Sequence, residues 1–126
     1  MRIINFLFIV FFPSILCWSC YYDNRESLYP SGAICDTLNI TYSGTISGII
    51  DIHCNKCHST AKAPTLGAGI ILDNHTALLV SVKNGSLYNS IAQNGLASEM
   101  PKNASKLDAC TIQKVRKWID KGALKN

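Results

Sequence analysis

The sequence predicts an all-α fold with three to four short helices and long loops between them. From residue 41 onward, apolar residues recur at the i, i+3 and i+4 spacing of helices in several short segments. No run of alternating β-branched residues indicates a strand. The intervening stretches 59–72 and 97–107 lack this spacing and contain glycine or proline, so we expect them to be loops.

Helical spacing and end signals define the first two expected helices. The first runs into Cys54 and has Ser43 or Thr45 as its N-cap; its apolar face consists of Ile46, Ile49 and Ile50. The second covers residues 74–83, has Asp73 or Asn74 as its N-cap and ends at Asn84-Gly85; its apolar residues are Ala77, Leu78 and Val82.

The last two expected helices follow the same rules. One covers residues 87–93 and ends at Asn94-Gly95. The other begins after Asp108, whose carboxylate can accept a backbone hydrogen bond as N-cap, and it stops near Gly122. Trp118 lies beside its apolar face, which consists of Ile112, Val115 and Ile119.

The N-terminal residues are typical of an export signal. Met1-Arg2 is a short positive region, and the apolar stretch 3–12 that follows is too short to span a bilayer. We therefore assign residues 1–19 to a signal peptide. Residues 20–40 show no periodicity and are expected to be a tether, which leaves residues 41–126 as one folded domain.

The end of this signal resembles a bacterial lipobox, in which a small residue precedes a cysteine that receives lipid after cleavage. Ser19 and Cys20 fit the pattern, whereas Cys17 and Trp18 depart from it. The resemblance implies an exported protein that acyl chains on Cys20 hold at the periplasmic side of a bacterial membrane. Ordinary cleavage near this point, which leaves a soluble protein, is the alternative.

The segment Cys54-Asn55-Lys56-Cys57-His58 has the C-x-x-C-H pattern of c-type haem attachment. Two thiols three positions apart can reach the two vinyl groups of one haem, and the adjacent histidine then lies under the iron. Export is consistent with this chemistry, because thiols can oxidise outside the cytoplasm and c-type haem is attached there. Long loops in a small domain also need a group to pack on. The sequence therefore predicts one covalent haem c on Cys54 and Cys57, with His58 as an iron ligand.

Two other uses of a C-x-x-C pair fit the sequence less well. A thioredoxin-like redox pair is expected in a βαβ context, which the pattern lacks. A zinc site needs two further ligands at metal spacing, and only His53 and His75 remain. We expect His53 at the end of a helix and His75 on the surface near a helix start, and we assign neither a role.

Met100 is the expected second axial ligand of the iron. It lies 42 residues after His58, and Met1 is the only other methionine. A thioether favours Fe(II) and raises the potential relative to two histidine ligands, and Pro101 stiffens the loop behind it. The alternatives are a methionine packed on the core, His75 as the sixth ligand, or an open site.

Taken together, these motifs resemble the class I cytochrome c domains. The likeness consists of a helix that enters C-x-x-C-H, a Met-Pro loop and a last helix that ends in Trp-Ile-x-x-Gly-Ala, here Trp118 to Ala123. It covers residues 41–126 and implies a fold wrapped around the haem, with crossed first and last helices and the tryptophan in the core. Residues 19–23, Ser-Cys-Tyr-Tyr-Asp, also resemble the start of small bacterial cytochrome lipoproteins.

Cys35 and Cys110 lie outside the haem motif. In an exported chain, a disulfide between them would tie the tether to the last helix. The alternative is two free thiols.

The sequence predicts an electron carrier and not an enzyme. It contains no evident acid/base pair, nucleophile or Ser/His/Asp arrangement. The net charge is +4, and the basic run of Lys114, Arg116 and Lys117 is interpreted as a solvated helix face, or else as a docking patch for an acidic redox partner. No basic stripe with interleaved aromatic residues predicts nucleic-acid binding. The alternative functions are a ligand-binding or peroxidase-like haem module with an open iron site, and a structural lipoprotein without haem.

Overall fold

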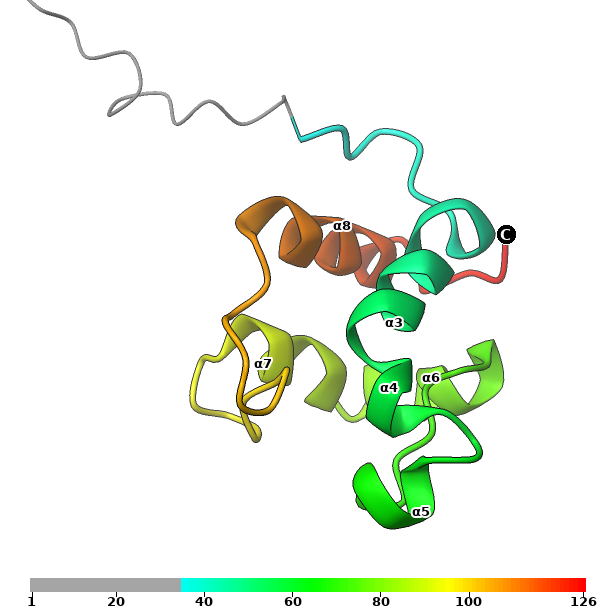
Figure 1. Ribbon diagram of the computed structural model, residues 1–126. Helices are drawn as coiled ribbons and strands as arrows, with labels where there is room; N and C mark the ends of the chain where they lie inside the picture. The colour runs from blue at the N-terminus through cyan, green and yellow to red at the C-terminus, as the bar shows by residue number, and fades with distance from the viewer. Residues whose placement is uncertain (1–34) are drawn as a thin grey trace, which may run out of the picture. The chain divides into compact units, whose positions relative to one another are not determined.

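A computed structural model describes residues 35–126 of the chain. The expected signal peptide, Cys20 and residues 20–34 of the expected tether lie outside the described residues. The regular elements of the described part are all helices and include no strand, as the predicted all-α class requires (Figure 1). They number seven where the sequence predicts three to four, because single helical turns at the motif and in the loops leave no apolar spacing to detect. The elements are η1 (Tyr42–Ile46), α3 (Ser47–His53), α4 (Asn55–His58), α5 (Ala63–Leu66), α6 (His75–Lys83), α7 (Ser86–Ala92) and α8 (Ala109–Asp120). None of these helices is long and apolar enough to cross a membrane.

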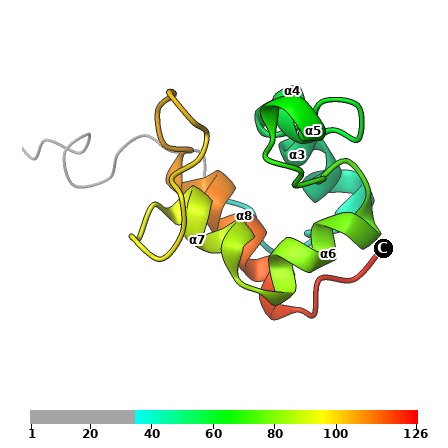
Figure 2. The same cartoon turned by 90° about the horizontal axis from the view of Figure 1, so that it is seen from below.

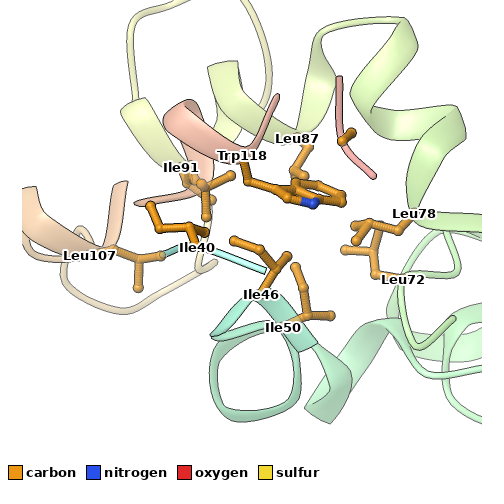
Figure 3. Packing of buried hydrophobic residues seen from close by; sticks show 11 residues of the cluster. Ile40, Ile46, Ile50, Leu72, Leu78, Leu87, Ile91, Leu107 and Trp118 are labelled. Carbon is orange, nitrogen blue, oxygen red and sulfur yellow. The ribbon is translucent and has the colours of Figure 1, made fainter. Parts of the chain in front are cut away.

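The hydrophobic core forms around Trp118 of α8, whose side chain is 1% exposed. Buried side chains from four other helical elements, from two loops and from the segment before η1 surround its ring (Figure 3): Ile40, Ile46, Ile50, Leu72, Leu78, Leu87, Ile91 and Leu107. The indole N–H donates a hydrogen bond to the carbonyl of Leu124 at 3.0 Å, so the one polar atom of this large ring is satisfied. α8 packs against both η1 and α7, and Trp118 thus joins the start, the middle and the end of the domain.

The first helical segment begins earlier than the sequence predicts. Thr41 is the N-cap of η1 and accepts a hydrogen bond from the N–H of Gly44 at 3.0 Å, so neither Ser43 nor Thr45 has this role. Ser43 lies inside the first turn, and its N–H donates to the carbonyl of Asn126 at 2.9 Å. The chain after α8 therefore supplies a partner that no local spacing could indicate.

The two longest helices begin where their capping residues predict. Asn74 accepts a hydrogen bond from the N–H of Ala77 at the start of α6. Asp108 accepts from the N–H and the hydroxyl of Thr111 at 2.9 and 2.6 Å at the start of α8. These hydrogen bonds lower the pKa of Asp108, because they favour its charged form.

The sequence predicts His75 on the surface, whereas the structure shows it partly buried within an aromatic cluster. It is the first residue of α6, and its ring meets the Tyr42 ring edge-on at 4.7 Å and the Trp118 ring at 6.0 Å between centroids. Its Nε2 lies 2.8 Å from the carbonyl oxygen of Ala123. Because a carbonyl only accepts, Nε2 carries a hydrogen. The segment after α8 covers His75. The residue spacing within α6 therefore could not predict that this side chain is partly buried.

The compact unit begins at Cys35, within the segment expected to be a tether. Cys35 and Cys110 form a disulfide, the bond expected from the sequence, with their Cα atoms 5.4 Å apart. Ile40 is 5% exposed and belongs to the core. Residues 35–40 are therefore part of the folded domain, fastened to the start of α8.

Replacement of Cys35 and Cys110 by serine together is expected to lower the free energy of unfolding by about 2–5 kcal/mol. The bond closes a segment with a sequence separation of 75, and a cross-link over so long a loop restricts the unfolded chain strongly. Chemical denaturation of the double variant and the native protein measures the difference. An unchanged unfolding midpoint would contradict this expectation. So would reaction of Cys35 and Cys110 themselves with a blocking reagent in the untreated native protein, located by peptide mass spectrometry.

Candidate functional site

The C-x-x-C-H residues lie where α3 gives way to a single further helical turn. α3 ends at His53, and Cys54 departs from helical geometry with a φ of −122° before α4 begins. The N–H groups of Cys57 and His58 both donate to the carbonyl of Cys54, at 3.0 and 2.9 Å. Residues three apart in such a turn share one face. The structure therefore brings Cys54, Cys57 and His58 together, as the motif predicts.

The two motif cysteines are partly buried, and neither forms a disulfide. Burial raises the pKa of Cys54 to about 11, because a thiolate loses its hydration when it is removed from water. The thiol of Cys54 is therefore protonated at neutral pH. Two free thiols on one turn can hold a covalent group at two points.

The ring of His58 is oriented by a backbone carbonyl. Its Nδ1 lies 3.0 Å from the carbonyl oxygen of Ile70. Because the carbonyl can only accept, Nδ1 carries the hydrogen, and Nε2 of the neutral ring keeps its lone pair. A histidine that ligates a metal typically has this arrangement, since the hydrogen bond fixes both the tautomer and the ring orientation. The residues present therefore suit an iron ligand at His58.

The loop after His58 folds back along the motif. The N–H of Leu72 donates to the carbonyl of His58 at 2.8 Å. Beyond it, the N–H and the hydroxyl of Thr60 both donate to the carboxylate of Asp73, the hydroxyl at 2.9 Å. The loop also contains the short helix α5, which the sequence spacing does not reveal. Neither Ile70 nor Asp73 is predictable from the sequence as part of the site, because nothing in the motif specifies the returning segment.

Gly67 lies against the motif so closely that no side chain fits there. A Cβ atom at this position would lie 2.6 Å from the carbonyl oxygen of Cys57 and 2.9 Å from Nδ1 of His58. Real Cβ atoms do not approach other atoms this closely, so glycine is required by contact and not by an unusual φ, which is −105° here. A glycine in a Pro/Gly-containing loop was the only sequence signal for this residue.

Several large apolar side chains next to the motif are exposed. Ile52 precedes Cys54 in α3 and is 75% exposed, and two residues of the returning loop, Leu66 and Ile70, are 61% and 43% exposed. Ile52 lies in the helix that leads into the motif, Leu66 lies in the short helix that follows it, and Ile70 contacts His58 through its backbone carbonyl. An apolar group attached at this site would cover surface that otherwise faces water.

Met100 lies on a separate segment, the loop between α7 and α8. Figure 2 shows α3, α4 and α5 at one end of a row formed by α6, α7 and α8, and this loop at the other end. The backbone of Met100 is fastened to the end of α7: its N–H donates to the carbonyl of Ser90 at 3.1 Å, and its carbonyl accepts from Nε2 of Gln93 at 3.3 Å. The hydrogen bonds of Met100 are thus with α7, and none connects it to the motif residues.

The remaining charged and metal-binding candidates lie apart from the motif turn or form no cluster. Arg116 of the basic run pairs with Asp120 at 3.0 Å and lies 4.9 Å from the centroid of the Tyr88 ring, so it helps to join α8 to α7. Lys117 is exposed on α8. Within residues 35–126, no group of three or more histidine, cysteine, aspartate or glutamate side chains could hold a metal ion.

Comparison of the chain with protein-family models, with curated proteins and with solved structures found no match. The function of the site is therefore inferred from its own residues and geometry.

Substitution Gly67→Ala is expected to lower the free energy of unfolding by about 1–3 kcal/mol, because the added methyl displaces the His58 ring or the backbone of Cys57. Chemical denaturation measures the loss. Gly48→Ala is the matched control: a Cβ there meets nothing within 4 Å, and alanine suits the interior of α3 better than glycine. Equal effects of the two substitutions would show that the close approach at Gly67 does not matter.

Proposed function

We propose that residues 35–126 form a class I-like monohaem cytochrome c domain that carries electrons. The observation that supports this most strongly is the C-x-x-C-H turn itself, with two free thiols and a histidine whose Nδ1 is hydrogen-bonded to the carbonyl of Ile70. The exposed apolar side chains beside the turn suit a large apolar group. When bound, the haem supplies a one-electron Fe(III)/Fe(II) couple.

The protein residues would act by attachment and orientation. The thiols of Cys54 and Cys57 would hold the haem through thioether bonds to its two vinyl groups. Each S–H would add across one C=C bond, with sulfur on one carbon and hydrogen on the other, so no oxidant or leaving group would be needed. Nε2 of His58 is the nitrogen free to ligate iron, because Nδ1 donates to Ile70. The fixed ring keeps this ligand in place in both oxidation states, as an electron carrier requires.

Met100 is proposed as the second axial ligand. Its backbone is held at both the N–H and the carbonyl by α7, which supports a fixed position for this loop. Occupation of both axial positions favours electron transfer, whereas an open position favours ligand binding or peroxidase-like chemistry. Rapid binding of carbon monoxide to the untreated reduced protein would support the second function over the first.

Substitution Met100→Ala is expected to leave the haem covalently attached, to lower its midpoint potential and to open the iron to added ligands, because loss of the thioether removes a ligand that favours Fe(II). Potentiometric titration and cyanide binding measure these effects. Leu96→Ala is the control, since Leu96 lies in the same loop and is 76% exposed. If the midpoint potentials of the Met100→Ala and Leu96→Ala variants are equal, Met100 is not an iron ligand.

We further propose that the domain is exported and held by lipid on Cys20 at the periplasmic side of a bacterial membrane, where it exchanges electrons with redox partner proteins. The signal-like residues 1–19 and Ser19-Cys20 support this location. Mass spectrometry of the mature N-terminus is expected to find acylated Cys20. An unmodified Cys20 would refute the anchor without affecting the haem site.

A further inference from the structure

Asp73 joins the loop after the motif to its returning end. Its carboxylate accepts hydrogen bonds from both the N–H and the hydroxyl of Thr60, and a further one from Nδ2 of Asn74 at 3.2 Å. Thr60 is the second residue after His58, and Asp73 directly precedes Asn74, the N-cap of α6. One exposed carboxylate therefore connects the exit of the motif to the start of the next long helix.

The Thr60–Asp73 pair is the outermost of three contacts between the same two segments. Inside it, Leu72 N–H donates to the carbonyl of His58, and the carbonyl of Ile70 meets Nδ1 of His58 at 3.0 Å. Residues 70–73 form no helix or strand of their own. Their position therefore depends on contacts of this kind, and Leu72 is held from its other side by burial in the core.

We propose that Thr60 and Asp73 are positioning residues for His58, which hold the Ile70 carbonyl in place so that it fixes the ring of the iron ligand. The redox consequence of this role rests on the proposed function. The bonds from Thr60 are the main cause of the lowered pKa of Asp73. At neutral pH the carboxylate is therefore charged, and both hydrogen bonds are charge-assisted.

The expected consequence is a shift of the haem potential. A hydrogen bond from Nδ1 to a carbonyl makes the histidine a stronger donor through Nε2, which favours Fe(III) over Fe(II) and lowers the potential. A loosened returning segment weakens that bond. Asp73→Asn and Thr60→Val are therefore expected to raise the midpoint potential, whereas Thr60→Ser keeps both donors and leaves it unchanged.

The chain offers a closely matched control. Asp108 also accepts the N–H and the hydroxyl of a threonine, Thr111, and its pKa is lowered in the same way, but it caps α8 instead of adjoining the motif. Asp108→Asn is expected to reduce stability by loss of similar hydrogen bonds while the potential stays near the native value. Its comparison with Asp73→Asn separates positioning of His58 from general loosening of the fold.

The test combines potentiometric titration of the matured protein with hydrogen exchange of the Leu72 amide, followed by NMR. We expect Asp73→Asn and Thr60→Val to raise the potential and to speed this exchange at least tenfold, and the double variant to go little further than either alone. Asp108→Asn should do neither. An equal loss of stability in Asp73→Asn and Asp108→Asn, with the potential and the Leu72 exchange unchanged, would overturn the proposal.

The two proposals fail in distinguishable ways. A native protein without covalent haem refutes the proposed function, and the Leu72 exchange then still tests whether Thr60 and Asp73 hold the returning segment. If the protein carries haem but its midpoint potential is unchanged by Asp73→Asn and by Thr60→Val, only the positioning role is refuted. If Asp73→Asn does not accumulate, Thr60→Val gives the same decision, because it removes only the hydroxyl bond.

Discussion

Burial of Trp118 is the interaction on which the rest of the domain depends. Its ring lies among side chains from η1, α3, α6 and α7 (Figure 3), and its indole N–H holds the carbonyl of Leu124 in the segment after α8. That segment in turn provides the carbonyl of Ala123 to His75 and that of Asn126 to Ser43. Because η1 and α3 pack in this core and lead directly into Cys54, the position of the motif follows from the packing of the tryptophan.

The site itself depends on a second and more local constraint. The motif turn forms from its own backbone hydrogen bonds, but the ring of His58 is fixed only where residues 70–73 return. These residues are held by hydrogen bonds to His58 and Thr60, by the burial of Leu72 and by the close fit of Gly67 against Cys57 and His58. Secondary structure therefore positions the cysteines, whereas a loop with little secondary structure orients the histidine. The orientation of the His58 ring therefore depends on individual contacts in this loop, such as those of Ile70 and Gly67.

Periodicity and capping were enough to find the helices whose faces point to the core. α6 and α8 begin directly after their N-caps, Asn74 and Asp108, and the necessary signals lie within a few residues of each cap. The burial of His75 was not predictable in this way, since its cover comes from Ala123, far along the chain. The short helix α5 spans too few residues for its spacing to be recognised.

In the candidate site, too, local sequence signals predict some residues and not others. Its three motif residues follow from residue type and spacing. Ile70, Gly67 and Asp73 do not, because their roles arise from the fold of one loop onto the motif. The pairing of Cys35 with Cys110 was expected because these two cysteines lie outside the motif in a chain with an export signal. The link between Met100 and the iron stays a prediction, since the hydrogen bonds of this residue are with α7.

A redox-titrated absorbance spectrum of the protein, produced together with haem-maturation machinery, decides whether Cys54 and Cys57 carry a haem. We expect the spectrum of a single c-type haem that survives denaturation, because Cys54 and Cys57 hold it covalently. We also expect one transition that involves one electron, and a reduced spectrum that added carbon monoxide leaves unchanged. Folded protein without haem absorbance, or with haem that denaturation removes, would contradict the proposed covalent haem site.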